Sequence, residues 1–224
     1  MPRLRRAVLV DGVPGVRRGV LAQGVVPGLV AVRDYQHTIR PMPAFASTVR
    51  RCTPADAATV AELGARLFVQ AYGPTHPEPE LGRYLARSFS TDFFARELAD
   101  PGVRVLIVEA ADGTALGYAH MRATTGTPPG EVTGDRPVEI IRFYVDAQWH
   151  GRGLAQALMT ACETEARAMG ADVIWLDVWQ EAPRPQAFYR RAGFTIVGTT
   201  TFAFGERQDA DFVMARPLPP TVTS

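Results

Sequence analysis

The 224-residue chain contains no lysine and no asparagine, so all 24 of its Lys and Arg positions are arginine. The lack of lysine excludes a phosphate-binding loop that ends in Gly-Lys-Ser/Thr, and it excludes a Schiff base on a lysine amine. Cysteine is also scarce. The two thiols, Cys52 and Cys162, are too few for a disulfide framework or a metal-ligand cluster, and they fit a reduced, cytoplasmic setting.

An excess of one charge and a long hydrophobic run are missing as well. The formal net charge is +1, so bulk charge does not favour binding to nucleic acid or to anionic lipid. No apolar run approaches the roughly 20 residues that a membrane-spanning helix needs. His37, His76 and His120 show no metal-ligand spacing, and we therefore expect no metal. With 46% hydrophobic residues, the chain can bury the core of one domain of ordinary size.

Residues 1–44 differ in character from the rest of the chain. They contain seven arginines and two aspartates, a net charge of +5, whereas the remainder has 17 basic and 21 acidic residues. Asp11, Pro14, Arg17 and Arg18 interrupt the apolar centre that a secretory signal requires. We interpret this segment as a basic, weakly structured extension, or as sequence upstream of the true start. A basic arm that contacts nucleic acid or a partner is the functional alternative.

Hydrophobic periodicity predicts one mixed α/β domain over residues 45–218, followed by a tail at residues 219–224. We expect strands at residues 47–52, 103–110, 115–123, 138–145, 173–179, 194–197 and 211–215, and helices after Thr53, at 81–89, after Ser90, at 152–169 and at 184–192. The helix between the strands at 138–145 and 173–179 forms a crossover, so these two strands should be parallel.

A glycine-containing turn separates the strand that ends at Val145 from the next helix. It reads Gln148-Trp149-His150-Gly151-Arg152-Gly153-Leu154-Ala155. The first N–H groups of a helix have no partner within it, and the helix dipole adds partial positive charge at the same place. Gly151 and Gly153 allow the backbone to approach an anion without a Cβ in between. The turn therefore predicts a pyrophosphate cradle. It is not of the dinucleotide type, because the third glycine of that fingerprint would fall on Gln156.

Two motifs resemble those of the GNAT family of N-acetyltransferases. The spacing Gln148-x-x-Gly151-x-Gly153-x-Ala155 resembles the acetyl-CoA loop of that family, and Ala187-Phe188-Tyr189-Arg190-Arg191-Ala192-Gly193-Phe194 resembles its second signature. The resemblance spans about residues 45–218 and implies one domain with a central mixed, mostly antiparallel sheet flanked by helices. Within the family, the chain looks closest to the bacterial PaiA-type polyamine acetyltransferases. The stretches that carry this likeness are residues 139–145, 174–179, 202–205 and 211–214.

One position departs from the family pattern. GNAT enzymes often have an asparagine seven residues before the signature tyrosine, where its amide contacts the pantetheine arm of the cofactor. Here that residue is Ala182. We expect backbone groups or water to replace this contact, with no effect on the pyrophosphate turn or on Tyr189.

The resemblance implies that an amine attacks the thioester of acetyl-CoA directly, in a ternary complex, and that coenzyme A leaves as a thiol. Tyr189 is then the candidate acid for the leaving thiolate, because a phenol can donate a proton at neutral pH. Val145 would polarise the thioester carbonyl through its backbone N–H. The residues expected to bind acetyl-CoA are Phe143, Tyr144, Val145, Gln148, His150, Gly151, Arg152, Gly153, Leu154, Ala155, Phe188 and Arg191.

Glu139 is the candidate base that deprotonates the amine. It opens an otherwise apolar strand, and strict alternation places it on one face with Ile141, Phe143 and Val145. A carboxylate on such a face is costly unless it is solvated or paired. An ion pair with Arg142 or with another arginine is therefore the structural alternative.

Trp175, Asp177 and Trp179 alternate along the next strand and should share one face. An acid between two tryptophans could hold a cationic amine through charge and cation–π contact, so these are the candidate acceptor-binding residues. The alternative is a helix-covered aromatic face in which Asp177 is paired with an arginine.

These observations predict an acetyl-CoA-dependent N-acetyltransferase whose first-choice acceptor is a polyamine or a similar small amine. The same chemistry on an amino acid, an aminoglycoside-like drug or a protein N-terminus stays open. A non-catalytic acyl-CoA-binding regulatory module is the alternative of another class, and Ala182 favours it. A nucleic-acid-binding regulator would rest on the basic extension alone, and the acidic body argues against it. We expect no membrane partner, and the oligomeric state, a homodimer included, stays open.

Overall fold

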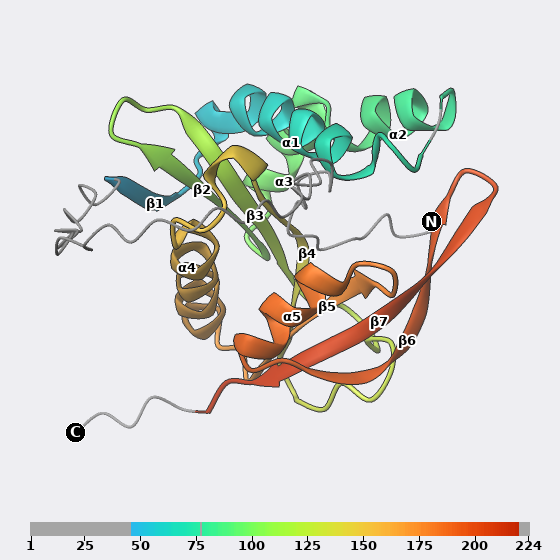
Figure 1. Cartoon of the computed structure of the whole chain (residues 1–224). Helices are drawn as coiled ribbons and strands as arrows, with labels where there is room; N and C mark the ends of the chain where they lie inside the picture. Colours follow the sequence, from blue (N-terminus) through green and yellow to red (C-terminus); the bar gives the residue numbers. More distant parts are fainter. Residues whose placement is uncertain (1–45, 77, 220–224) are drawn as a thin grey trace, which may run out of the picture.

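The computed structural model describes residues 46–76 and 78–219, so the predicted extension at residues 1–44 and most of the predicted tail lie outside the described residues. The elements follow the predicted order (Figure 1). In chain order they are β1 (Ser47–Arg51), η1 (Pro54–Asp56), α1 (Ala57–Tyr72), α2 (Glu80–Ser88), α3 (Thr91–Ala99), β2 (Val103–Ala110), β3 (Ala115–Ala123), β4 (Pro137–Val145), η2 (Ala147–Trp149), α4 (Leu154–Ala168), β5 (Val173–Trp179), α5 (Pro183–Arg191), β6 (Thr195–Phe204) and β7 (Arg207–Pro217).

The strands form one seven-stranded sheet in the order β1-β2-β3-β4-β5-β7-β6. Every neighbouring pair is antiparallel except β4 and β5, which are parallel as the crossover predicts. This confirms the predicted fold class. The parallel pairing is short, because only Pro137–Glu139 are aligned with Val173–Trp175. Beyond these residues β4 and β5 separate.

Helices cover the two faces of the sheet in separate groups. One core cluster combines α1 side chains, such as Leu67 and Phe68, with side chains from α2, α3 and the sheet. The other combines Leu158 and Cys162 of α4 with Phe188 and Tyr189 of α5. Figure 1 shows α1, α2 and α3 on one side of the sheet, and α4 and α5 on the other. No helix in the described part of the chain is both long and apolar enough to cross a membrane.

A bulge in β4 makes one predicted feature wrong. Met121 of β3 is aligned with Ile140 and His120 with Arg142, so Ile141 is an extra residue without a partner on β3. An extra residue reverses the alternation of side chains along the strand. Phe143 accordingly packs in the core beneath α4 and α5, together with Val138 and Ile140. Glu139 therefore does not share a face with Phe143 and Val145, and lies on the side of α3.

The carboxyl-terminal hairpin is longer than predicted. β6 and β7 are aligned from Thr195 with Ala215 to Phe204 with Arg207, and Gly205 turns the chain with a φ of +60°. The polar run at residues 199–201 hides the strand pattern, because one arm of the hairpin is largely exposed.

The two cysteines are buried free thiols on opposite faces of the sheet and form no disulfide, as expected.

Candidate active site

The turn after β4 is held in place by α1. Asp146, which is 4% exposed, accepts a hydrogen bond from the backbone N–H of Gln148 at 3.1 Å and forms an ion pair with Arg66. Gln70 binds the turn at two points: its Nε2 donates to Asp146 at 3.3 Å, and its Oε1 accepts from the N–H of Ala147 at 3.1 Å. Burial alone would raise the pKa of Asp146, but the hydrogen bonds from Arg66 and the turn lower it. The carboxylate is thus a fixed anchor for the turn.

The glycines shape the entrance to α4. Gly151 and Gly153 have φ values of +77° and +79°, which L-residues rarely adopt. A Cβ built on either glycine would meet no atom within 4 Å, so the space in front of the turn is open. The first helical hydrogen bond runs from the N–H of Ala157 to Gly153 at 3.0 Å. The N–H groups of the first turn therefore have no acceptor within the helix and can bind an anion.

A cavity of about 410 Å³ lies against this turn. Its lining contains eight of the twelve predicted cofactor-binding residues, namely Val145, His150, Gly151, Gly153, Leu154, Ala155, Phe188 and Arg191. The sequence did not single out the other four lining residues as cofactor-binding, namely Trp149, Gln156, Arg184 and Ala187. Arg184 and Arg191 come from the two ends of α5, so two cations face the glycine turn across the cavity. A guanidinium matches the geometry of a phosphate.

The remaining four predicted residues lie elsewhere. Gln148 is exposed, and the guanidinium of Arg152 lies over the Trp149 ring at 4.9 Å from its centroid. The Phe143 ring packs inside the core, 5.6 Å from the ring of Phe188. Tyr144 lies on the opposite face of the sheet, stacked on Tyr118 at 5.7 Å. These four residues do not line the cavity.

Tyr189 is fully buried next to the cavity wall. Its ring packs edge-on against Phe143, Phe188 and Phe194, with centroid distances of 6.1, 5.4 and 5.8 Å. Its hydroxyl has no hydrogen-bond partner among the residues that the structure describes. Burial raises the pKa of Tyr189 well above its usual value, so the phenol is protonated at neutral pH. A buried, unpaired proton donor is uncommon and calls for a ligand or a functional explanation.

Backbone N–H groups of β4 face the gap between β4 and β5. The N–H of Asp146 donates to the carbonyl of Leu116 in β3 at 2.8 Å. Because N–H directions alternate along a strand, those of Phe143 and Val145 point to the other side, toward β5. Strand pairing with β5 ends at Glu139, so the ladder does not use these two donors. Their position fits the carbonyl-polarising role predicted for Val145.

The turn between β5 and α5 contains the position where the family often has asparagine. Ala182 caps α5 without a side-chain hydrogen bond. Gln186, which is 6% exposed, fills the turn instead: its Nε2 donates to the carbonyls of Trp179 and Gln180, each at 2.9 Å. Gln186 thus fixes the end of β5. Sequence reasoning missed it because its role depends on the local backbone geometry.

Glu139 is 1% exposed and is aligned with Trp175 in the last pair of the β4–β5 ladder. Its side chain lines a second cavity, of about 480 Å³, on the α3 side of the sheet. The ion pair with Arg142 that was the alternative is absent: in the described part of the chain no carboxylate lies within 4.0 Å of that guanidinium. The carboxylate is therefore placed where the two strands begin to separate.

The predicted acceptor-side residues of β5 share one face, as expected. Ile174, Leu176 and Val178 pack in the opposite core cluster, and the face that carries Trp175 packs separately. Trp179 is aligned with Asp211 of β7, so the two lie on the same face. Three aspartates on this face are buried, namely Asp177, Asp209 and Asp211. Among them, Asp209 pairs with Arg207 and lies 3.3 Å from His76 Nε2.

Comparison with known proteins agrees with this geometry. The model of the acetyltransferase (GNAT) family matches residues 66–194. An uncharacterized N-acetyltransferase of Mycobacterium tuberculosis is 35% identical over 164 residues, covering 73% of this chain and 98% of the relative. The chain belongs to the GNAT family and is an acetyl-CoA-dependent N-acetyltransferase.

Two further similarities concern a relative with a named activity and a solved structure of similar fold. Aminoglycoside N(6')-acetyltransferase type 1 of Stenotrophomonas maltophilia is 31% identical over 154 residues, covering 68% of this chain and 89% of the relative. The crystal structure of PaiA N-acetyltransferase from Thermoplasma acidophilum, in complex with coenzyme A, has a TM-score of 0.62 at 17% identity. The match covers 77% of this chain and 99% of that chain. At that identity the likeness is one of fold.

The residues around the first cavity fit coenzyme A. The glycine turn offers first-turn N–H groups to a diphosphate, and Arg184 and Arg191 of α5 face the same space. The β4 N–H groups offer donors to an extended amide chain. Tyr189, whose hydroxyl has no partner within the described part of the chain, packs against Phe143 of β4. No cluster of three or more His, Cys, Asp or Glu side chains that could hold a metal occurs within the described ranges.

Proposed function

We propose that the acetyl acceptor is a small molecule with more than one ammonium group, with a polyamine as first choice. The observation that carries this proposal is the face of β5 and β7 on which Asp177 and Asp211 are buried beside Trp179, while Asp209 on the same face is paired with Arg207. Carboxylates and an aromatic ring together attract ammonium groups. A polyamine and an aminoglycoside share this polycationic character, and the aminoglycoside acetyltransferase relative gives the proposal further support.

In this proposal, acetyl-CoA supplies an activated acyl group, and the residues of this chain move the protons. Glu139 accepts a proton from the ammonium group of the acceptor, directly or through water, and so produces the neutral amine that attacks. The N–H groups of Val145 and Phe143 stabilise the oxygen of the thioester carbonyl as negative charge develops on it. A C–N bond forms and the C–S bond breaks, and Tyr189 gives its proton to the departing sulfur. The attacking nitrogen then loses its second proton, which returns through water to the Tyr189 oxygen and leaves a neutral amide.

A polycationic acceptor would also fit the PaiA-like grouping that the sequence resembles.

The two buried free thiols support the expectation of a reducing, cytoplasmic setting.

The test is a panel of amines assayed with acetyl-CoA by thiol release, with spermidine, spermine, an aminoglycoside, lysine and a peptide N-terminus. We expect the polycations to give the highest kcat/KM. Asp177→Asn should raise KM for spermidine more than it lowers kcat, whereas Asp112→Asn, in the hairpin turn between β2 and β3, should change neither. The absence of any rate above background with spermidine and spermine would reject the polyamine and leave the family assignment intact.

A further inference from the structure

The second cavity lies on the face of the sheet opposite α4. It is bounded by α2 and α3 on one side and by β3 and β4 on the other, and it measures about 480 Å³. Four arginines line it, namely Arg87, Arg96, Arg122 and Arg142, against two glutamates, Glu97 and Glu139. Its volume is in the range of pockets that bind small molecules. The lining therefore gives a concave surface with an excess of positive charge.

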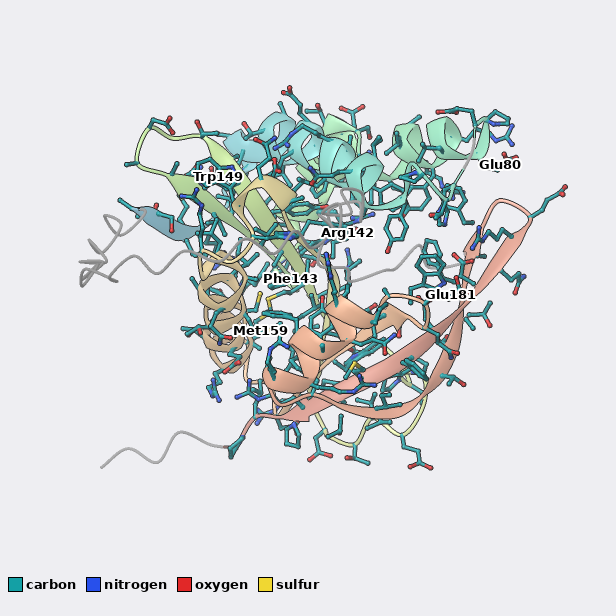
Figure 2. All side chains as sticks on the ribbon, viewed as in Figure 1. Glu80, Arg142, Phe143, Trp149, Met159 and Glu181 are labelled. Atoms are coloured by element: carbon teal, nitrogen blue, oxygen red, sulfur yellow. The ribbon has the colours of Figure 1, made fainter. Side chains whose placement is uncertain are left out.

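Arg142 is the central feature of this cavity. It is 2% exposed, and its Nη1 lies 3.1 Å from Nδ1 of His120. Its guanidinium lies over the rings of Phe89 and Phe93, at 4.7 and 5.1 Å from their centroids. Figure 2 places Arg142 on the side of the sheet that faces α1–α3, away from Phe143 and Met159. Aromatic faces stabilise a cation only in part, and a buried charge without a counter-ion is costly.

The nearby glutamate Glu97 does not compensate Arg142. Its carboxylate accepts hydrogen bonds from Nη2 of Arg122 at 2.6 and 2.7 Å and contacts Nε2 of His120 at 2.7 Å. Burial lowers the pKa of His120 to about 4, so the imidazole is neutral. In that state Nδ1 accepts from Arg142, while Nε2 remains in close contact with the Glu97 carboxylate. The charge of Glu97 is thus matched by Arg122. Among the described residues no carboxylate, that of Glu139 included, lies within 4.0 Å of the Arg142 guanidinium.

The rim of the cavity adds donors of the same kind. Arg87 and Arg96 are exposed at the ends of α2 and α3, and neither forms an ion pair with another described residue. Ser88 lines the cavity at 2% exposure, and its hydroxyl has no hydrogen-bond partner in the described part of the chain. Arg87, Arg96 and Ser88 therefore line one space, and none of the three side chains has an acceptor among the described residues.

We propose that this cavity binds a small molecule through a carboxylate or phosphate group. The buried Arg142 and Ser88 form the floor of the site, and Arg87 and Arg96 contact the anion from the rim. The guanidinium of arginine can donate two parallel hydrogen bonds, and both a carboxylate and a phosphate present the paired oxygens that accept them. The site is separate from the glycine turn. It shares Glu139 with the acceptor side in the proposed function, so an anion bound here would lie beside the proposed base.

Calorimetric titration with inorganic phosphate and, separately, with succinate tests the proposal. The titrations use full-length protein at low ionic strength, with saturating coenzyme A so that phosphate does not bind at the glycine turn. We expect one equivalent of at least one probe to bind, and the preferred probe identifies the source as a phosphate or a carboxylate. In the double variant R87Q/R96Q, affinity should fall about fivefold or more.

The matched control is the double variant R83Q/R190Q, which removes two exposed arginines outside the cavity. Its affinity should stay within about twofold of the wild type, because exposed charges at a distance are screened. In addition, the probe should raise the Tm of the wild type but not of Arg142→Met. No binding of either probe, or equal weakening in both double variants, would overturn the proposal. If Arg142→Met does not fold, the two double variants decide.

Discussion

Glu139 of β4 and Trp175 of β5 are the last aligned residues of the parallel strand pair, and beyond them the two strands separate. The separation leaves the N–H groups of Phe143 and Val145 facing a gap rather than a strand. The glycine turn with its arginines lies at the far end of β4, and Tyr189 packs against Phe143 beside the gap. In the proposed arrangement the cofactor lies along β4, with its thioester between Tyr189 and Glu139.

Tyr189→Phe tests the proposed acid. We expect kcat to fall about a hundredfold or more, since a positioned acid contributes a factor of that order. Affinity for coenzyme A should stay unchanged. The free energy of unfolding should not decrease, because the lost hydroxyl has no hydrogen-bond partner in the described structure. Steady-state kinetics, calorimetry and urea unfolding measure the three quantities.

Tyr118→Phe is the matched control for this experiment. Tyr118 is also fully buried and its hydroxyl also lacks a partner among the described residues, but it packs on the opposite face of the sheet from Tyr189. Its substitution should leave kcat unchanged. Equal losses in the two variants would show that the effect is structural and that Tyr189 is not the acid.

Glu139→Gln tests the proposed base through the pH profile. Without the carboxylate, the acceptor must lose its proton in solution, and an alkyl ammonium has a pKa of about 10. We expect kcat/KM of the variant to be lower than that of the wild type near neutral pH and to recover as the pH rises. The measurement is kcat/KM against pH for the best amine of the panel.

Glu131→Gln, at an exposed loop position, serves as the control and should follow the wild-type profile. A Glu139→Gln profile parallel to that of the wild type, without recovery at high pH, would contradict the base role. The carboxylate would then serve only to support the structure of β4.

Much of the fold is readable from the sequence where local signals are strong. The strands on either side of Asp112-Gly113 were predicted at their observed bounds, because two apolar runs flank a turn in which Gly113 has a φ of +84°. The glycine turn was also predicted correctly, because its signal is local to a few residues. Glycine adopts positive φ readily, so the residue type alone indicates the backbone conformation that Gly151 and Gly153 have in the turn.

Features that depend on partners far along the chain were missed. β4 reads as one continuous apolar run, and nothing in that run marks Ile141 as the bulge, since the bulge arises from the register with β3. Arg184 and Gln186 were also missed as site residues, because the turn that precedes α5 determines where they point. Register and turn geometry are tertiary properties and carry weak local signals.

The buried His120 predicts a stability change at mildly acidic pH. Burial lowers its folded-state pKa to about 4 from the ordinary 6.5, despite the hydrogen bond with Glu97. Between these values the unfolded chain binds a proton that the folded protein does not, so stability falls as the pH decreases. The full effect is about 3 kcal/mol, and His120→Gln should remove most of this slope. Urea unfolding at a series of pH values measures it.

His150→Gln is the control for the pH experiment. His150 lies in the glycine turn and is partly exposed, so its substitution removes an imidazole without removing a buried one. A His120→Gln variant with the same pH dependence as the wild type would show that His120 is not held neutral in the folded protein. It would also weaken the charge argument for Arg142.

Calorimetric titration of coenzyme A into the wild type, Gly153→Val and Gly113→Val tests the central claim most directly. Both glycines have φ near +80° and open space at Cβ, so both substitutions carry a similar backbone strain of about 1–2 kcal/mol. Only Gly153 faces the proposed diphosphate. We predict one coenzyme A per chain, equal affinity for the wild type and Gly113→Val, and at least about tenfold weaker binding for Gly153→Val. No heat of binding with the wild type, or equal affinity for both valine variants, would contradict the account.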